Sequence, residues 1–150
     1  EELQRASYSV VHIASHGQIE SDPRKSFLLA YDGRITMAHL EGYLKHSRLR
    51  QESVDLLTLS ACRTAAGDDR AALGLAGMAV KAGARSALAT LWYVSDQASS
   101  MLVTEFYRVM SAGGVGKAAA LREAQLKVLA DPRYRHPSYW APFLLIGNWQ

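Results

Sequence analysis

Three short apolar segments limit what this chain can fold into more than any other feature of its sequence. They span Tyr8–Ser15, Val54–Ser60 and Ser86–Tyr93, and each is nearly continuous in apolar character. Strands of this kind are buried on both faces, as in a parallel sheet. Segments with helical periodicity separate them, so we predict an α/β fold with a mostly parallel sheet and helices on both faces.

The remaining segments predict the connecting elements. Phe27–Tyr31 and Arg34–Thr36 flank Asp32-Gly33, and this dipeptide favours a two-residue hairpin loop. A last short strand is expected over Phe143–Ile146. Capping residues or glycines mark the ends of the predicted helices. These helices cover Met37–His46 after Thr36, Leu73–Ala82 before Gly83, the residues from Ser95-Asp96 to about Ala112, and Gly116–Ala130.

Composition and charge argue against several classes of function. The chain has 150 residues, 49% of them hydrophobic, which suits one globular domain over residues 1–150. Its net charge of +3 comes from scattered Lys and Arg residues, so nucleic acid is not an expected partner. No run of about 18 apolar residues is present, so no membrane-spanning helix is expected. A single cysteine cannot form an internal disulfide bond, and we therefore expect a reducing, cytoplasmic location.

Cys62, the single cysteine, stands where the second apolar segment ends. Small and polar residues surround it in LTLSACRTAAG (57–67), as is typical of a chain leaving the core. His16 similarly ends the first segment and is followed by Gly17. The carboxyl ends of neighbouring parallel strands meet at one edge of a sheet, so we expect His16 and Cys62 to face each other there. The expected separation of the sulfur from an imidazole nitrogen is roughly 4 to 7 Å, close enough for proton transfer after small adjustments.

These residues also have structural interpretations. A free cysteine often only fills space in a core, and a mid-strand histidine such as His12 is more often a hydrogen-bonded core residue than a catalyst. One cysteine and five scattered histidines give no zinc-type spacing, so no metal site is predicted. The segment SHGQIES lacks the G-x-G-x-x-G pattern, and no nucleotide cofactor is expected.

Four segments together resemble the CHAT domain, a caspase-like protease domain that is related to separase and often attached to tetratricopeptide repeats in bacteria. In the order and spacing of that family, the segments are VHIASHG (11–17), LTLSACRTAAG (57–67), GLAGMAVKAGARSALATLWYVSD (74–96) and HPSYWAPFLLIG (136–147). The resemblance covers about residues 8–148, and it implies a caspase-like fold.

The resemblance also implies an activity, that of a cysteine endopeptidase that cleaves protein substrates without a cofactor. By this comparison, His16 and Cys62 would be the catalytic pair, and the N–H groups of Gly17 and Cys62 would form the oxyanion hole. A regulatory repeat module would lie outside this chain. The family's complete domain has a further α/β portion before the histidine strand. We therefore expect this chain to be a C-terminal part of the domain and to be inactive or nearly so by itself.

A preference for a basic residue before the scissile bond is a further implication of the resemblance. A desolvated cation needs a carboxylate partner, and Asp96 is the expected one. Asp96 also suits a helix N-cap, a position that Ser95 could take instead. Asp68 and Asp69 are the next candidates for the carboxylate.

Two non-proteolytic interpretations stay open from the sequence. The chain could be a non-catalytic interaction or scaffold domain that keeps the caspase-like fold. It could also be a flavodoxin-like ligand-binding domain in which Cys62 is a bystander, although it lacks phosphate-binding motifs.

Overall fold

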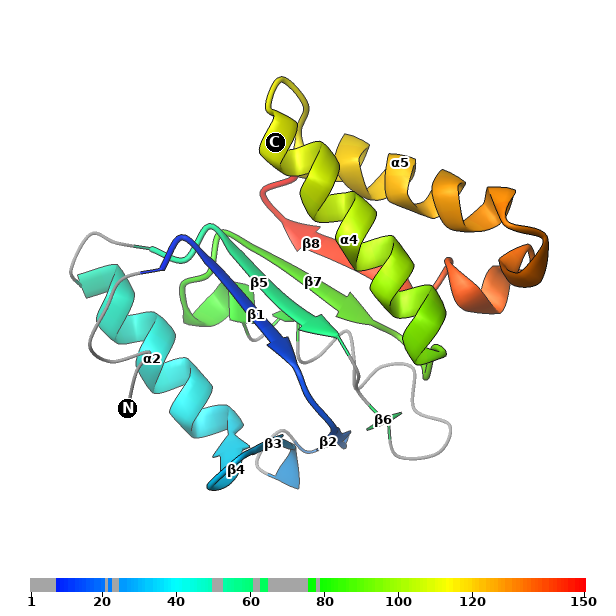
Figure 1. Ribbon diagram of the computed structural model, residues 1–150. Coiled ribbons are helices and arrows are strands. Elements are labelled where there is room, and N and C mark those ends of the chain that lie inside the picture. Colours follow the sequence, from blue (N-terminus) through cyan, green and yellow to red (C-terminus); the bar gives the residue numbers. More distant parts are fainter. Residues whose placement is uncertain are drawn as a thin grey trace.

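A four-stranded sheet forms the centre of the computed structural model, which describes residues 8–20, 22, 25–49, 53–60, 63–64, 76–77 and 79–150. The strands lie in the order β1 (Val10–Ala14), β5 (Leu56–Ser60), β7 (Ser86–Thr90) and β8 (Phe143–Gly147). The first three are parallel and β8 is antiparallel (Figure 1). The predicted α/β fold with a mostly parallel sheet is therefore confirmed.

The helices cover both faces of this sheet. They are α2 (Met37–Leu49), the helical residues 76–77 and 79–82, α4 (Asp96–Ala112) and α5 (Lys117–Ala130), with 3-10 turns η2 (Pro132–Tyr134) and η3 (Pro137–Tyr139). Thr36 caps α2 by accepting a hydrogen bond from the His39 N–H at 3.3 Å. Helix α2 extends three residues beyond the predicted end at His46.

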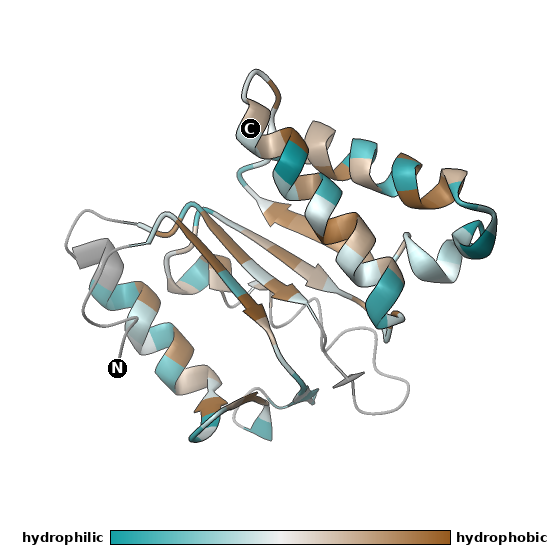
Figure 2. Ribbon diagram, in the orientation of Figure 1, coloured by the Kyte–Doolittle hydropathy of each residue, from teal (hydrophilic) through white to brown (hydrophobic). Residues whose placement is uncertain are grey.

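Each face of the sheet has its own hydrophobic core, because side chains alternate along a strand. Leu57, Leu59, Ala87 and Ala89 pack on one face against α2 and residues 79–82. Leu56 and Leu88 pack on the other face against α4 and α5. Figure 2 shows hydrophobic residues concentrated along these strands, with hydrophilic residues interspersed along the helices. This two-sided burial explains why the strands are nearly continuous apolar runs.

A second, smaller sheet lies beside the carboxyl end of β1. Its strands are ordered β4 (Gly33–Thr36), β3 (Phe27–Ala30), β2 (Gly17–Ile19) and β6 (Arg63–Thr64). The predicted hairpin forms, but Ala30 pairs with Gly33, so the two loop residues are Tyr31-Asp32 rather than Asp32-Gly33. This register sets Leu28 opposite Ile35, which brings two apolar side chains together.

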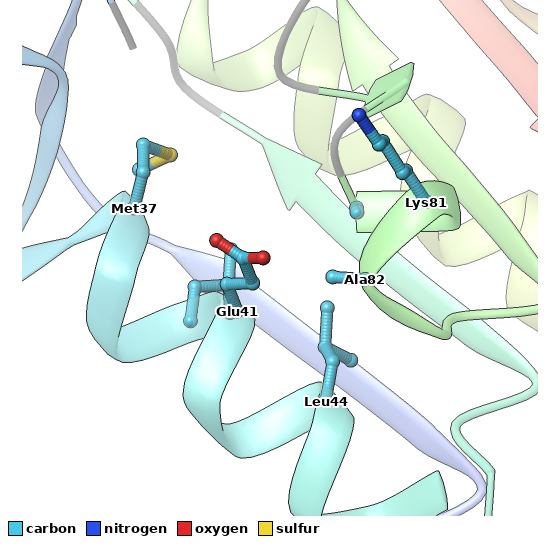
Figure 3. Close-up of a pocket in the computed structure, with 7 residues that line it drawn as sticks. Met37, Glu41, Leu44, Lys81 and Ala82 are labelled. Carbon is cyan, nitrogen blue, oxygen red and sulfur yellow. The ribbon is translucent and has the colours of Figure 1, made fainter. Parts of the chain in front are cut away.

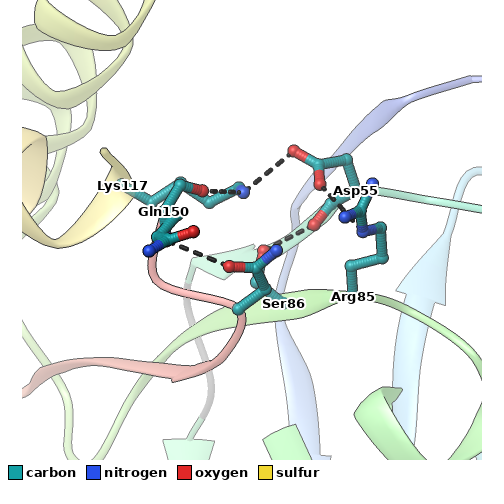
Figure 4. A network of polar contacts seen from close by, with 6 residues as sticks. Asp55, Arg85, Ser86, Lys117 and Gln150 are labelled. Atoms are coloured by element: carbon teal, nitrogen blue, oxygen red, sulfur yellow. Dashed lines mark hydrogen bonds and ion pairs between the residues drawn. The ribbon is translucent and has the colours of Figure 1, made fainter. Parts of the chain in front are cut away.

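Lys117 ties α5 to the amino edge of the central sheet (Figure 4). Its buried ammonium lies 3.0 Å from Oδ2 of Asp55 and donates to the carbonyl oxygen of Gln150 at 2.6 Å. Arg85 also approaches Asp55, at 3.7 Å, but its side chain is largely exposed. A buried ammonium needs such partners, because an uncompensated charge in the interior is unfavourable.

We predict that Asp55→Asn lowers the free energy of unfolding by about 1–3 kcal/mol, because Lys117 stays buried with one partner fewer. Arg85→Gln is the matched control, since an exposed ion pair contributes about 0–1 kcal/mol. Denaturant titrations of both variants check the prediction, and equal losses would show that burial of Lys117 is irrelevant.

Candidate functional site

A cleft of about 700 Å³ opens at the carboxyl end of the central sheet. The ends of β1 and β5 form one side of it, and the first three turns of α4 form the other. Its lining residues are His12, Ala14, Ser15, His16, Ser60, Val94, Asp96, Ser99, Ser100, Val103, Thr104 and Tyr107. This is the edge at which sites gather in parallel α/β sheets, and where the sequence predicts one.

His16 reaches this cleft from the turn between β1 and β2. Its side chain is exposed, and its backbone carbonyl accepts a hydrogen bond from the Leu29 N–H at 2.7 Å. The preceding hydroxyl, that of Ser15, donates to the carbonyl of Leu29. Strand β3 therefore holds the backbone of the histidine turn on one side.

The same peptide unit orients the N–H of Gly17. In a trans peptide, the carbonyl of one residue and the N–H of the next point in opposite directions, and the described chain has no cis peptide bonds. Since the His16 carbonyl points to β3, the Gly17 N–H points away from β3. Strand β2 pairs with β6 on its other side, so this donor is directed toward the β6 side.

Gly17 is also required by close packing. A Cβ atom at this position would lie 2.7 Å from the carbonyl oxygen of Phe27 and 2.8 Å from Cδ2 of Leu28. Both distances are shorter than van der Waals contact, so no larger residue fits without movement of β3.

Cys62 itself lies outside the described residues, and so do Asp68 and Asp69. The predicted distance between its sulfur and His16 is therefore not tested. The flanking pairings are described: Ser60 is opposite Ala14 in the β1–β5 ladder, and Arg63 is opposite Gln18 in the β2–β6 ladder. Parallel pairings therefore connect the residues before His16 to those before Cys62, and the residues after His16 to those after Cys62.

Asp96 lies on the α4 side of the cleft, in the first helical turn. Ser95 is the N-cap of α4, and its side chain accepts from the Ala98 N–H at 3.4 Å. The alternative that Asp96 caps the helix is therefore wrong, since the serine directly before it has that role. An exposed carboxylate in the first turn is still favoured by the helix dipole.

The floor of the cleft is polar. His12 Nε2 lies 2.7 Å from Oγ of Ser60, and the Tyr107 hydroxyl donates to Oγ1 of Thr58 at 2.8 Å. Partial burial lowers the pKa of His12, which favours its neutral form. Burial also raises the pKa of Tyr107, against the opposing effect of the Thr58 hydrogen bond.

Sequence reasoning missed most of this floor. His12 was expected to be a core histidine, yet it is exposed toward the cleft. Side chains alternate along a strand, which puts Ser60 on the same face as His12. This alternation could have indicated Ser60 as a residue of the cleft. Tyr107 follows Asp96 by three helical turns, a spacing that also places both residues on one face of α4.

Two other hollows are less suited to chemistry. One, of about 140 Å³, lies between α2 and residues 79–82 on the opposite face of the sheet (Figure 3). Its charged lining residues are Lys81 and Glu41, and Glu41 is ion-paired with Lys45 at 2.6 Å. The other is a shallow hollow along α4, lined by residues including Asp96 and Glu105. Within the described ranges, no group of three His, Cys, Asp or Glu side chains is arranged to hold a metal ion.

None of the helices in the described part of the chain is both long and apolar enough to span a bilayer.

Comparisons with known proteins identify a family. A family model described as "CHAT domain" matches residues 1–148. Tetratricopeptide repeat protein 28 of Mus musculus is 40% identical over 100 residues, which cover 64% of this chain and 4% of that protein. The protein of the same name from Homo sapiens is 42% identical over 67 residues, which cover 45% of this chain and 3% of that protein. The matched region is thus a small part of these much longer relatives.

We predict that Gly17→Ala destabilises the fold by about 1–3 kcal/mol, because the added methyl group overlaps β3. Gly42→Ala is the matched control: nothing lies within 4 Å of a Cβ there, and removing a glycine from the interior of α2 should stabilise by about 0.5–1 kcal/mol. Chemical denaturation of the two variants measures both effects. Equal signs would contradict the close approach of β3 to Gly17.

Proposed function

This chain belongs to the CHAT-domain family, and on that premise we propose that it is a cysteine endopeptidase in which Cys62 is the nucleophile and His16 the general acid and base. The proposal rests above all on the register of β1 with β5. Ala14 and Ser60 are paired, and each precedes its candidate by two residues. Gln18 and Arg63 are paired beyond the two candidates, so along the chain His16 and Cys62 each stand between the same two parallel ladders, which supports their meeting at this edge of the sheet.

Peptide cleavage then proceeds by acyl transfer. The Cys62 thiolate attacks the scissile carbonyl carbon, and the carbonyl oxygen becomes an oxyanion. His16, protonated by the thiol, transfers that proton to the leaving amine as the C–N bond breaks. The resulting thioester is hydrolysed by a water molecule that His16 deprotonates, and the thiol is restored.

The oxyanion needs hydrogen-bond donors that are already in place. We assign the N–H groups of Gly17 and Cys62 to this role, in line with the family. Support comes from the His16–Gly17 peptide, whose carbonyl is held by β3 so that its N–H is fixed in direction before substrate binds. Removing one such donor typically reduces the rate about 100-fold or more.

Asp96 is the proposed binding partner for a basic residue before the scissile bond. It lines the same cleft as His16 and does not cap α4. Hydroxyl groups of Ser99, Ser100 and Thr104 line the cleft along the same helix and would add hydrogen-bond acceptors for a cationic side chain.

Tetratricopeptide repeats are the proposed regulatory partner. The curated relatives carry these repeats in their names. A non-catalytic interaction domain of the same fold is the alternative, and the experiments on the two candidate catalytic residues separate it from a protease.

We predict that Cys62→Ala abolishes cleavage of protein and peptide substrates by the full-length protein and leaves its thermal unfolding temperature unchanged. His16→Ala should also abolish cleavage and, in addition, slow alkylation of Cys62 by iodoacetamide near pH 7, because the thiolate loses its cationic partner. Mass spectrometry of the peptide that contains Cys62 measures alkylation. Persistent cleavage in either variant, or unchanged alkylation in His16→Ala, would favour the interaction domain.

We predict that Asp96→Asn reduces the preference for Arg or Lys over Gln before the scissile bond by about tenfold or more, since a charge-assisted contact is lost. A panel of fluorogenic peptides measures the preference in the full-length protein. Ser95→Ala is the matched control, because it should cost about 1 kcal/mol of stability as a lost cap and leave the preference intact. An unchanged preference in Asp96→Asn would remove this residue from the binding site.

A further inference from the structure

The hydrogen bond between His12 and Ser60 crosses the two strands that lead to the proposed catalytic residues. In the ladder, His12 is opposite Thr58 and Ser60 is opposite Ala14. The bond of 2.7 Å from His12 to Ser60 therefore runs diagonally, from the middle of β1 to the last residue of β5. It joins the strands on the face that lines the cleft.

This link lies at the carboxyl end of the β1–β5 ladder. In the central sheet as described, β1 is at one end of the strand order and pairs only with β5. Among the described residues, the last pairing between them is Ala14 with Ser60. Beyond that pairing, the chain turns toward the smaller sheet, so the separation of the two strand ends depends on side chains as well as backbone.

The link belongs to the polar floor of the cleft, whereas the sheet face behind it is apolar. Leu56 and Leu88 are fully buried on the same face, against α4. A matched apolar pair can stabilise such a face as well as a hydrogen-bonded pair does. A satisfied polar pair instead fixes one geometry, because its bond has a preferred length and direction.

We propose that His12 and Ser60 are positioning residues that hold the ends of β1 and β5 at a fixed separation, and thereby set the distance between His16 and Cys62. The proposal rests on the proposed function, since it assigns His16 and Cys62 as the reacting pair. His12 and Ser60 do not themselves touch the scissile bond in this scheme.

The other contacts of His12 suit a fixed, uncharged ring. Tyr107 packs against the imidazole with 5.6 Å between ring centroids, and the Thr58 hydrogen bond fixes the tyrosine. Among the described residues, the other ionisable groups that line the same cleft are His16, Asp96 and Tyr107. Burial lowers the pKa of His12, which favours its neutral form.

The test measures iodoacetamide alkylation of Cys62 against pH in the full-length protein, with the label located by mass spectrometry. His12→Phe keeps an aromatic ring against Tyr107 but cannot bond to Ser60, and Ser60→Ala removes the partner. Both variants should raise the midpoint of the profile by about one pH unit, which is about a tenfold slower alkylation below the midpoint. His12→Gln, whose amide can reach about as far as Nε2, should restore the profile.

Ser86→Ala is the matched control. Its hydroxyl also bonds across strands, to the carbonyl of Asp55, but at the amino edge of the sheet (Figure 4). This variant should keep the wild-type profile even where its thermal stability falls as far as that of Ser60→Ala.

Each result has a distinct meaning. Wild-type profiles in His12→Phe and Ser60→Ala would overturn the positioning role, and so would a His12→Gln profile no better than that of His12→Phe. If His16→Ala leaves the profile unchanged, the proposed function fails. A shift in His16→Ala with none in His12→Phe would leave the proposed function standing and refute only this inference.

Discussion

The parallel pairing of β1 with β5 is the constraint on which the candidate site depends. Its register sets Ala14 opposite Ser60, and everything at the carboxyl edge follows from that pair. The turn with His16 continues from one member, and the chain toward Cys62 continues from the other. A shift by one residue would send the side chains of one strand to the opposite face, away from α4 and the cleft.

Burial on both faces protects this register. Leu57 and Leu59 are fixed in one core and Leu56 in the other, so β5 cannot slide without exposing apolar surface. The polar residues of β5 favour the same register. Thr58 and Ser60 lie on the α4 face, where they form hydrogen bonds with Tyr107 and His12. Stability and site geometry thus depend on the same strand.

Much of this architecture could be predicted from local patterns. The three apolar segments predicted adjacent parallel strands, and the structure shows β1, β5 and β7 in that arrangement. The hairpin loop was misplaced by one residue because pairing of Leu28 with Ile35 outweighs the loop preference of Asp32-Gly33. The roles of Tyr107 and Ser60 needed tertiary structure, since their partners lie 49 and 48 residues away in the sequence. The sequence pattern likewise left open whether Ser95 or Asp96 caps α4, a choice that depends on the backbone at the helix start.

The shared peptide plane of His16 and Gly17 has a mechanical consequence. Its carbonyl accepts a hydrogen bond from β3 while its N–H points the opposite way. The rigid peptide plane therefore couples the N–H to the β3–β4 hairpin. A rotation that swings the N–H must break or bend the bond to Leu29. Conversely, displacement of the β3–β4 hairpin would rotate the Gly17 N–H. The tip of this hairpin carries the fully exposed Tyr31. The position of the hairpin is therefore coupled to the direction of one backbone donor, the Gly17 N–H.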